Sequence, residues 1–116
     1  MRFDRVDQGR ERRLVDPARV GYPLTIIAEV EVESERLDLL DAMKRSFLTC
    51  PQVQQCYYVA GECDFVLVFL VKDMAQYTTL TRELFFENNN VKRFRTLVSM
   101  SNVKVGLEVP FEGRRP

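Results

Sequence analysis

The alternation of apolar and polar side chains predicts two strands joined by a tight turn between Val53 and Val71. The second strand, residues 65–71, carries apolar side chains on both of its faces: Phe65, Leu67, Phe69 and Val71 on one, and Val66, Val68 and Leu70 on the other. A strand in a half-solvated antiparallel sheet would alternate apolar and polar residues. We therefore expect both faces of this sheet to be covered, and in so short a chain we expect a second subunit to cover one of them.

The chain before this hairpin predicts one strand and one helix. Residues 24–32 alternate with a period of two, with Leu24, Ile26, Ala28, Val30 and Val32 on one face and Thr25, Ile27, Glu29 and Glu31 on the other. Apolar residues then recur at helical spacing through about Thr49, at Leu37, Leu40, Met43 and Phe47. Ser34 is the expected N-cap of this helix, with Glu35 in its first turn, and Pro51 prevents its continuation.

A second helix and a last strand are predicted after the hairpin. Asp73 is the expected cap of the helix, and its buried side is expected to carry Met74, Tyr77, Leu80, Thr81 and Leu84. The asparagines at 88–90 are expected to end it. A long strand follows over about residues 91–101, with Phe94, Thr96, Val98 and Met100 on one face, and residues 102–110 contain VKVGLEVP, a candidate for a short extra strand.

The order β-α-β-β-α-β predicts an α+β, ferredoxin-like domain with an antiparallel sheet and both helices on one face. The opposite face would be bare in a single copy, and it would carry Val66, Val68 and Leu70 together with Tyr57 or Tyr58. An exposed apolar sheet of this size is typical of an interface. Two such sheets packed face to face would form a two-fold dimeric α+β barrel.

Length and composition limit the domain layout and the classes of partner. The 116 residues suffice for one domain: we expect a flexible arm or linker remnant at 1–12, the folded domain at 13–110 with a short strand near 13–17, and a tail at 111–116. The 17 basic and 17 acidic residues cancel, which argues against a chain that mainly grips nucleic acid. Three cysteines without metal or disulfide spacing, and no membrane or signal segment, predict free thiols in the cytoplasm.

Signs of catalytic chemistry are weak. The chain has no histidine, which removes the commonest general base and transition-metal ligand, and it has no nucleotide-binding or serine-hydrolase motif. Glu29, Glu31, Glu33 and Glu35 are expected to form a solvated rim and no metal site. Cys63 lies beside no basic residue in the sequence, so it is a poor candidate for a nucleophile. We therefore expect neither a cofactor nor a catalytic residue.

The turn between the paired strands has two interpretations. Gly61 allows the positive φ that tight turns need, and Glu62 and Asp64 place two carboxylates at this end of the sheet. In one interpretation, the Asp64 side chain bonds nearby backbone amides. In the other, the acids receive the ammonium group of a small ligand at a subunit boundary. The residues alone do not decide between them.

Three segments resemble the C-terminal effector domain of Lrp/AsnC transcription regulators: RLVDPARVGYPLTIIAEVEVE, YYVAGECDFVLVFLVKD and VKRFRTLVSMSNVK. The resemblance covers about residues 13–110. It implies a domain that dimerises through its sheet, assembles further into octamers and binds amino acids where dimers meet. It also implies that Gly61, Glu62 and Asp64 line the effector site with Thr96 of the last strand. Two residues depart from the pattern: Cys63 replaces a common aromatic residue, and Phe94 replaces a usual threonine.

Such regulators also carry an N-terminal helix-turn-helix domain of roughly 50 residues that reads DNA. About 12 residues precede the first expected strand here, so we expect no direct DNA binding and interpret the chain as a truncated or stand-alone effector domain that a full-length regulator can join. The alternative is a small dimeric α+β-barrel enzyme, of the monooxygenase or isomerase type, with substrate between sheet and helices. A regulatory domain like the ACT domains of metabolic enzymes is a third interpretation. A large enclosed cavity within one subunit would favour the enzyme, and a polar crevice between dimers near Asp64 would favour the sensor.

Overall fold

The computed structural model describes residues 24–106 and 109–110. The elements follow one another as β1 (Leu24–Val32), α1 (Leu37–Leu48), β2 (Val53–Tyr58), β3 (Phe65–Val71), α2 (Met74–Thr81), the π-helical turn η2 (Arg82–Phe86) and β4 (Val91–Val98). The predictions for residues 1–12, 13–17 and 111–116 lie outside the described residues. Within the described part of the chain, no helix is long and apolar enough to cross a membrane.

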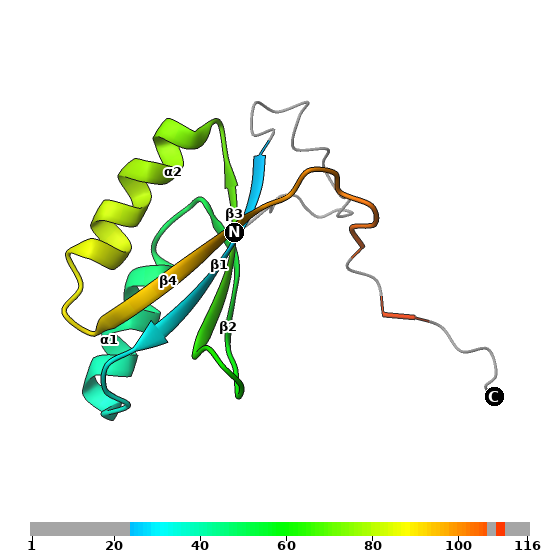
Figure 1. Cartoon of the computed structure of the whole chain (residues 1–116). Coiled ribbons are helices and arrows are strands. Elements are labelled where there is room, and N and C mark those ends of the chain that lie inside the picture. Colours follow the sequence, from blue (N-terminus) through cyan, green and yellow to red (C-terminus); the bar gives the residue numbers. More distant parts are fainter. Residues whose placement is uncertain (1–23, 107–108, 111–116) are drawn as a thin grey trace, which may run out of the picture.

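The four strands form one sheet in the order β2-β3-β1-β4, and each neighbouring pair is antiparallel. Both helices lie against the same face of this sheet (Figure 1). The predicted α+β, ferredoxin-like architecture is therefore confirmed. The two central strands of this sheet, β1 and β3, have neighbouring strands on both edges, whereas β2 and β4 are the edge strands.

The core lies between the sheet and the helices. One set of alternating side chains on β1 and β3 is fully buried there: Ile26, Ala28, Val30, Phe65, Leu67, Phe69 and Val71. From the helical side, the ring of Phe85 lies 6.2 Å from that of Phe47 and 6.4 Å from that of Phe69, both at edge-to-face angles. These rings pack into the space between the two layers, so the apolar face of the sheet is sealed against water.

The other face of the sheet, here called the open face, has no helix of the described residues over it. Directly paired residues share a face, so the register places Ile27, Val66, Val68, Leu70, Leu97 and Tyr57 on this side. The apolar character of both faces of β3 is thus confirmed. Tyr57 lies on the open face as expected, whereas Tyr58 turns to the helical side, with its ring 5.2 Å from that of Phe65.

Two of the three predicted segment ends differ in the structure. The prediction for Ser34 is wrong: α1 begins at Leu37, and the Ser34 hydroxyl accepts a hydrogen bond from the Arg36 N–H at 3.2 Å, in the turn before the helix. Asp73 is confirmed as the cap of α2, since its carboxylate accepts from the Gln76 N–H at 2.8 Å. The last strand ends at Val98, and the described residues of the 102–110 segment form no strand.

Asn90, just before β4, connects two parts of the chain that are distant in sequence. Its side chain is buried, with Oδ1 accepting from the Ser34 N–H and Nδ2 donating to the Ser34 carbonyl, each at 2.9 Å. The Glu33 N–H also donates to the Asn90 carbonyl at 2.8 Å. This pair of side-chain bonds fixes the connection between β1 and α1.

Asn90→Ala is therefore expected to lower the free energy of unfolding by about 2–3 kcal/mol, because it leaves two backbone groups of Ser34 without their partners. The exposed neighbour Asn89 provides the matched control, and Asn89→Ala should cost less than about 0.5 kcal/mol. Urea denaturation followed by circular dichroism measures both changes. Equal losses for the two variants would show that the Asn90 side chain does not fix this connection.

Candidate functional site

The hairpin between β2 and β3 is shaped by one glycine and one carboxylate. Gly61 has a φ of +155°, a conformation that residues with a Cβ rarely adopt, although a Cβ there would meet nothing within 4 Å. Glycine is therefore favoured here by the backbone conformation, since the surrounding space would accept a larger side chain. Asp64 then returns the chain to the sheet: its N–H donates to the Val30 carbonyl, and its carbonyl accepts from the Val59 N–H, both at 2.8 Å.

The Asp64 side chain makes a long-range contact. Its Oδ2 accepts a hydrogen bond from the Val32 N–H at 2.9 Å, which ties the turn to the end of β1. This is the backbone-amide role that the sequence left open for Asp64. A carboxylate held by a backbone amide makes a stronger bond than a neutral acceptor would. The turn is therefore fixed relative to β1 before any ligand is bound.

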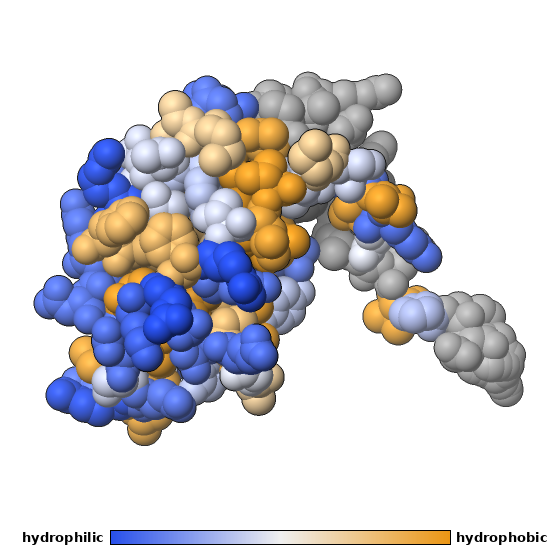
Figure 2. Space-filling view, in the orientation of Figure 1, coloured by the Kyte–Doolittle hydropathy of each residue, from blue (hydrophilic) through white to orange (hydrophobic). Residues whose placement is uncertain are grey.

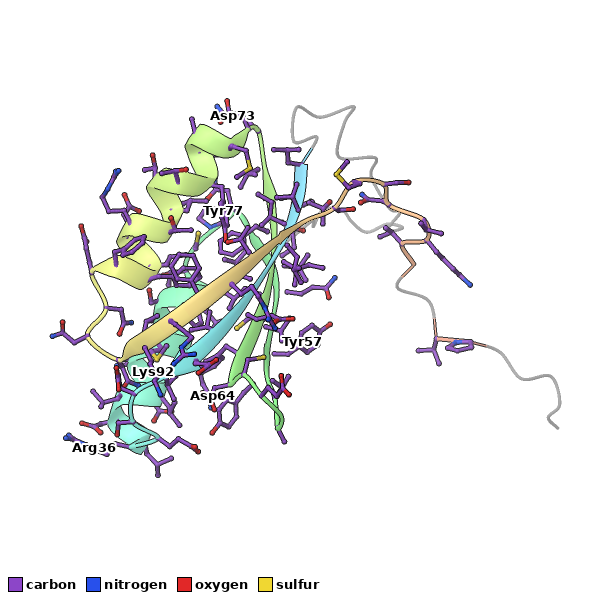
Figure 3. All side chains as sticks on the ribbon, viewed as in Figure 1. Arg36, Tyr57, Asp64, Asp73, Tyr77 and Lys92 are labelled. Atoms are coloured by element: carbon purple, nitrogen blue, oxygen red, sulfur yellow. The ribbon has the colours of Figure 1, made fainter. Side chains whose placement is uncertain are left out.

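A polar hollow lies beside this turn on the open face. It encloses about 440 Å³, within the range of small-molecule sites, and it is lined by Glu29, Glu31, Glu62, Cys63, Arg93, Phe94 and Arg95. The lining comes from three places: the second half of β1, the first half of β4 and the hairpin turn. Figure 3 shows Asp64 and Lys92 at this end of the sheet, whereas Tyr77 lies between α2 and the sheet. This hollow belongs to a single subunit, and a crevice between dimers near Asp64 stays a prediction.

Two cross-strand ion pairs form one wall of the hollow. The register places Glu29 opposite Arg95 and Glu31 opposite Arg93. Arg95 Nε donates to Glu29 Oε1 at 3.0 Å, and Arg93 Nε lies 3.6 Å from Glu31 Oε1. The bond to the Glu29 carboxylate raises the pKa of Arg95 above its ordinary value. Glu29 and Glu31 thus have ion-pair partners on β4, which the interpretation as a solvated rim did not predict. The sequence signal for these pairs was a Glu-x-Glu pattern on one strand and an Arg-x-Arg pattern on its neighbour.

Thr96 lies on the other side of the sheet from this hollow. Its hydroxyl oxygen is 2.7 Å from the Tyr77 hydroxyl oxygen, and Tyr77 is buried beneath α2. The structure therefore brings three of the four predicted effector residues together at the hairpin and separates Thr96 from them. Of those three, Glu62 lines the hollow, Gly61 shapes the turn and Asp64 fastens it. Effector contact by any of the four stays a prediction.

The hollow is poorly suited to thiol or metal chemistry. Burial, and then the negative charges of Glu29 and Asp64, raise the pKa of the Cys63 thiol, so the reactive thiolate is disfavoured. In the described part of the chain, no three His, Cys, Asp or Glu side chains gather in a way that could hold a metal ion. Cys50, Cys56 and Cys63 are all free thiols, as predicted. What the hollow offers is paired positive and negative charge for binding.

Comparison with known proteins assigns this arrangement to a family. The family model described as "Lrp/AsnC ligand binding domain" matches residues 25–109. The chain belongs to the Lrp/AsnC family. An uncharacterised transcriptional regulator of the helix-turn-helix type, y4tD from Sinorhizobium fredii, is 42% identical over 99 residues. This alignment covers 85% of the chain but 59% of that Lrp/AsnC relative, so the chain spans less than two thirds of its length.

Solved structures of Lrp/AsnC regulators share the fold. An AsnC family transcriptional regulator from Agrobacterium tumefaciens superimposes with a TM-score of 0.79 at 22% identity, covering 87% of this chain and 65% of that one. A transcriptional regulator from Neisseria meningitidis, solved in complex with L-Met, also has a TM-score of 0.79, at 18% identity over 89% of this chain and 66% of its own. At these identities the likeness establishes the common fold.

Proposed function

We propose that this chain senses an amino acid, or a related small molecule, and assembles the subunits of an Lrp/AsnC-type transcription regulator. The match to the family's ligand-binding domain over residues 25–109 carries this proposal. The Neisseria meningitidis regulator of the same fold was solved with L-Met, which supports an amino acid as the class of ligand. We include control of genes in the proposal because relatives are named as transcriptional regulators of the helix-turn-helix type. With a formal net charge of zero, this chain's own part in it is sensing and assembly, without DNA contact.

The hollow fits the charge pattern of a free amino acid. Its two arginines can bind a carboxylate group. Its three glutamates carry one more negative charge than the two arginines neutralise, and they can bind an ammonium group. Glu62 is exposed at the rim, and it makes no ion pair with any other described residue. We assign it the ammonium contact, with Gly61 and Asp64 holding the turn in place. Thr96 belongs to this site only if the ligand or a second subunit draws it from its bond with Tyr77.

The open face is the proposed contact between two subunits. Val66, Val68 and Leu70 lie there half-buried, beside Ile27 of β1. Burial of apolar surface contributes about 25 cal/mol for each Å² removed from water, so a second copy packed on this face would stabilise the sheet. A homodimer of this kind is the unit from which the proposed octamer would assemble. The hollow lies at the charged end of the same face, where a bound effector would affect the assembly of subunits.

The packing between the sheet and the helices argues against the enzyme alternative. It requires room for substrate between sheet and helices, and that layer is packed with the rings of Phe47, Phe65, Phe69 and Phe85. The matched relatives are transcriptional regulators, which also favours sensing over catalysis.

The proposed site is tested by calorimetric titration of the chain with the standard protein amino acids, beginning with L-Met. We expect saturable binding of at least one of them. Glu62→Gln should weaken that binding about 10-fold to 100-fold, since a bond to a charged group contributes about 1.5–3 kcal/mol. Glu87→Gln, at an exposed glutamate after η2, is the matched control and should change affinity less than about 2-fold.

Two outcomes would count against this site. Unchanged affinity in Glu62→Gln would remove Glu62 from the contact, and the absence of binding by every amino acid would reject amino-acid sensing. Thr96→Val, measured in the same way, decides whether the fourth predicted residue contacts the effector.

A further inference from the structure

The segment after β4, residues 99–110 and here called the C-terminal arm, has the pattern of a strand without a sheet. Its sequence alternates Val103, Val105, Leu107 and Val109 with Lys104, Gly106, Glu108 and Pro110. Such alternation is typical of a strand with one buried face. The described residues of the arm form no strand, however, and Val103 is 93% and Val109 88% exposed. Val103, Val105 and Val109 thus present an apolar side that the described residues of this copy leave exposed.

The start of the arm is fixed to the sheet. The Ser99 N–H donates to the Thr25 carbonyl at 2.9 Å, and Asn102 Nδ2 donates to Thr25 Oγ1 at 3.3 Å. Ser99 Oγ also donates to Asn102 Oδ1 at 2.7 Å, which closes a small turn. From this anchor the arm leaves the domain on the side of the sheet away from the helices (Figure 1). That is the side of the open face, where the second copy of the proposed dimer would lie.

The domain and the arm therefore each expose apolar surface on the same side of the molecule. Figure 2 shows hydrophobic side chains gathered along the margin of the domain that faces the arm, and more of them on the arm itself. Residues 103–110 would span about 26 Å when extended, and the six residues of β2 span about 20 Å. The arm is long enough to run along a full strand of a neighbouring copy.

We propose that the arm of each copy adds as a fifth strand to the free edge of β2 in a second copy, with Val103, Val105 and Val109 facing the space between the two open faces. This inference rests on the proposed sheet-to-sheet dimer. Of the two edge strands, β2 borders the apolar part of the open face, with Tyr57 beside Val66. The β4 edge carries one apolar residue on this face, Leu97, and the two charged residues Arg93 and Arg95. An unpaired edge strand offers a row of backbone N–H and C=O groups to such an arm.

Hydrogen exchange tests the arm separately from the dimer. In a strand added to an edge, only alternate N–H groups face the neighbouring strand. In the 116-residue chain, one alternate set of arm amides, either Val103 and Val105 or Lys104 and Gly106, should therefore exchange at least about 10-fold more slowly at concentrations where the dimer forms than after dilution to the monomer. Free exchange of both alternate sets in the dimer would overturn the inference, because the arm would then have no partner strand. Equal protection in the monomer would also overturn it, because the arm would then be folded onto its own copy.

A matched pair of variants tests the same contact by affinity. The double variant Val103→Thr, Val105→Thr keeps side-chain shape and should weaken the dimer about 10-fold to 100-fold, whereas Lys104→Thr should change it less than about 3-fold. Sedimentation velocity over a concentration series measures both. If both variants dimerise as tightly as the unaltered chain, the arm inference fails while the sheet-to-sheet dimer stands. If the unaltered chain does not dimerise, both fail.

Discussion

Phe85→Ala is expected to lower the free energy of unfolding by about 3–5 kcal/mol, the usual cost of removing a buried phenylalanine ring from a core. Phe85 is 2% exposed, and its ring contacts those of Phe47, Phe69 and Phe94. The loss is a large part of the roughly 5–15 kcal/mol that stabilises a typical domain. Urea denaturation, monitored by far-ultraviolet circular dichroism, measures it directly.

The next residue supplies the control for this change. Phe86 is 73% exposed, and among the aromatic rings of the described residues its ring packs against that of Phe94, at 5.5 Å. Both residues belong to η2, so differences in helix propensity cancel between Phe85→Ala and Phe86→Ala. Phe86→Ala should cost less than about 1 kcal/mol. Similar losses in the two variants would contradict a core that lies between the sheet and the helices.

Val68→Glu is expected to abolish dimerisation and leave a folded monomer. Val68 lies on the open face between Ile27 and Gln55, whereas the adjacent Leu67 and Phe69 face the core. The glutamate would therefore meet water in a single copy and an apolar surface in a dimer. Burying an unpaired charge costs several kcal/mol, so the dissociation constant should rise at least about 1000-fold. Light scattering measures the mass, and circular dichroism checks the fold.

Leu48→Glu is the matched control for charge. Leu48 ends α1, is 82% exposed and lies on the helical side of the molecule. The same introduced charge there should leave the mass and the dissociation constant unchanged. A Val68→Glu chain that dimerises like the unaltered one would show that the open face lies outside the interface.

The strands and their faces could be predicted from local pattern, because a strand's period of two assigns each side chain to a side once the strand is recognised. This holds for β1, for β3 and for the shared face of Phe94 and Thr96. The start of α1 could not be predicted in the same way. Ser34 has the right side chain for an N-cap, but its backbone is held by Asn90, which lies 56 residues further along the chain.

The candidate site was predictable at the hairpin and not beyond it. The residues at 61–64 show the turn, yet the partner of the Asp64 carboxylate is the Val32 amide, which only strand order and register bring near. The ion pairs of Glu29 and Glu31 likewise depend on the register of β1 against β4. Thr96 shows a limit of the family resemblance. The resemblance grouped Thr96 with the hairpin, whereas the alternation of side chains along β4 turns it toward Tyr77.

The mass of the unaltered chain in dilute buffer tests the central claim, that a second copy covers the open face. Sedimentation equilibrium, over protein concentrations from the nanomolar to the micromolar range, should reveal a species of twice the 13.6 kDa chain mass, or a multiple of that dimer. A folded species of 13.6 kDa throughout that range would contradict the claim.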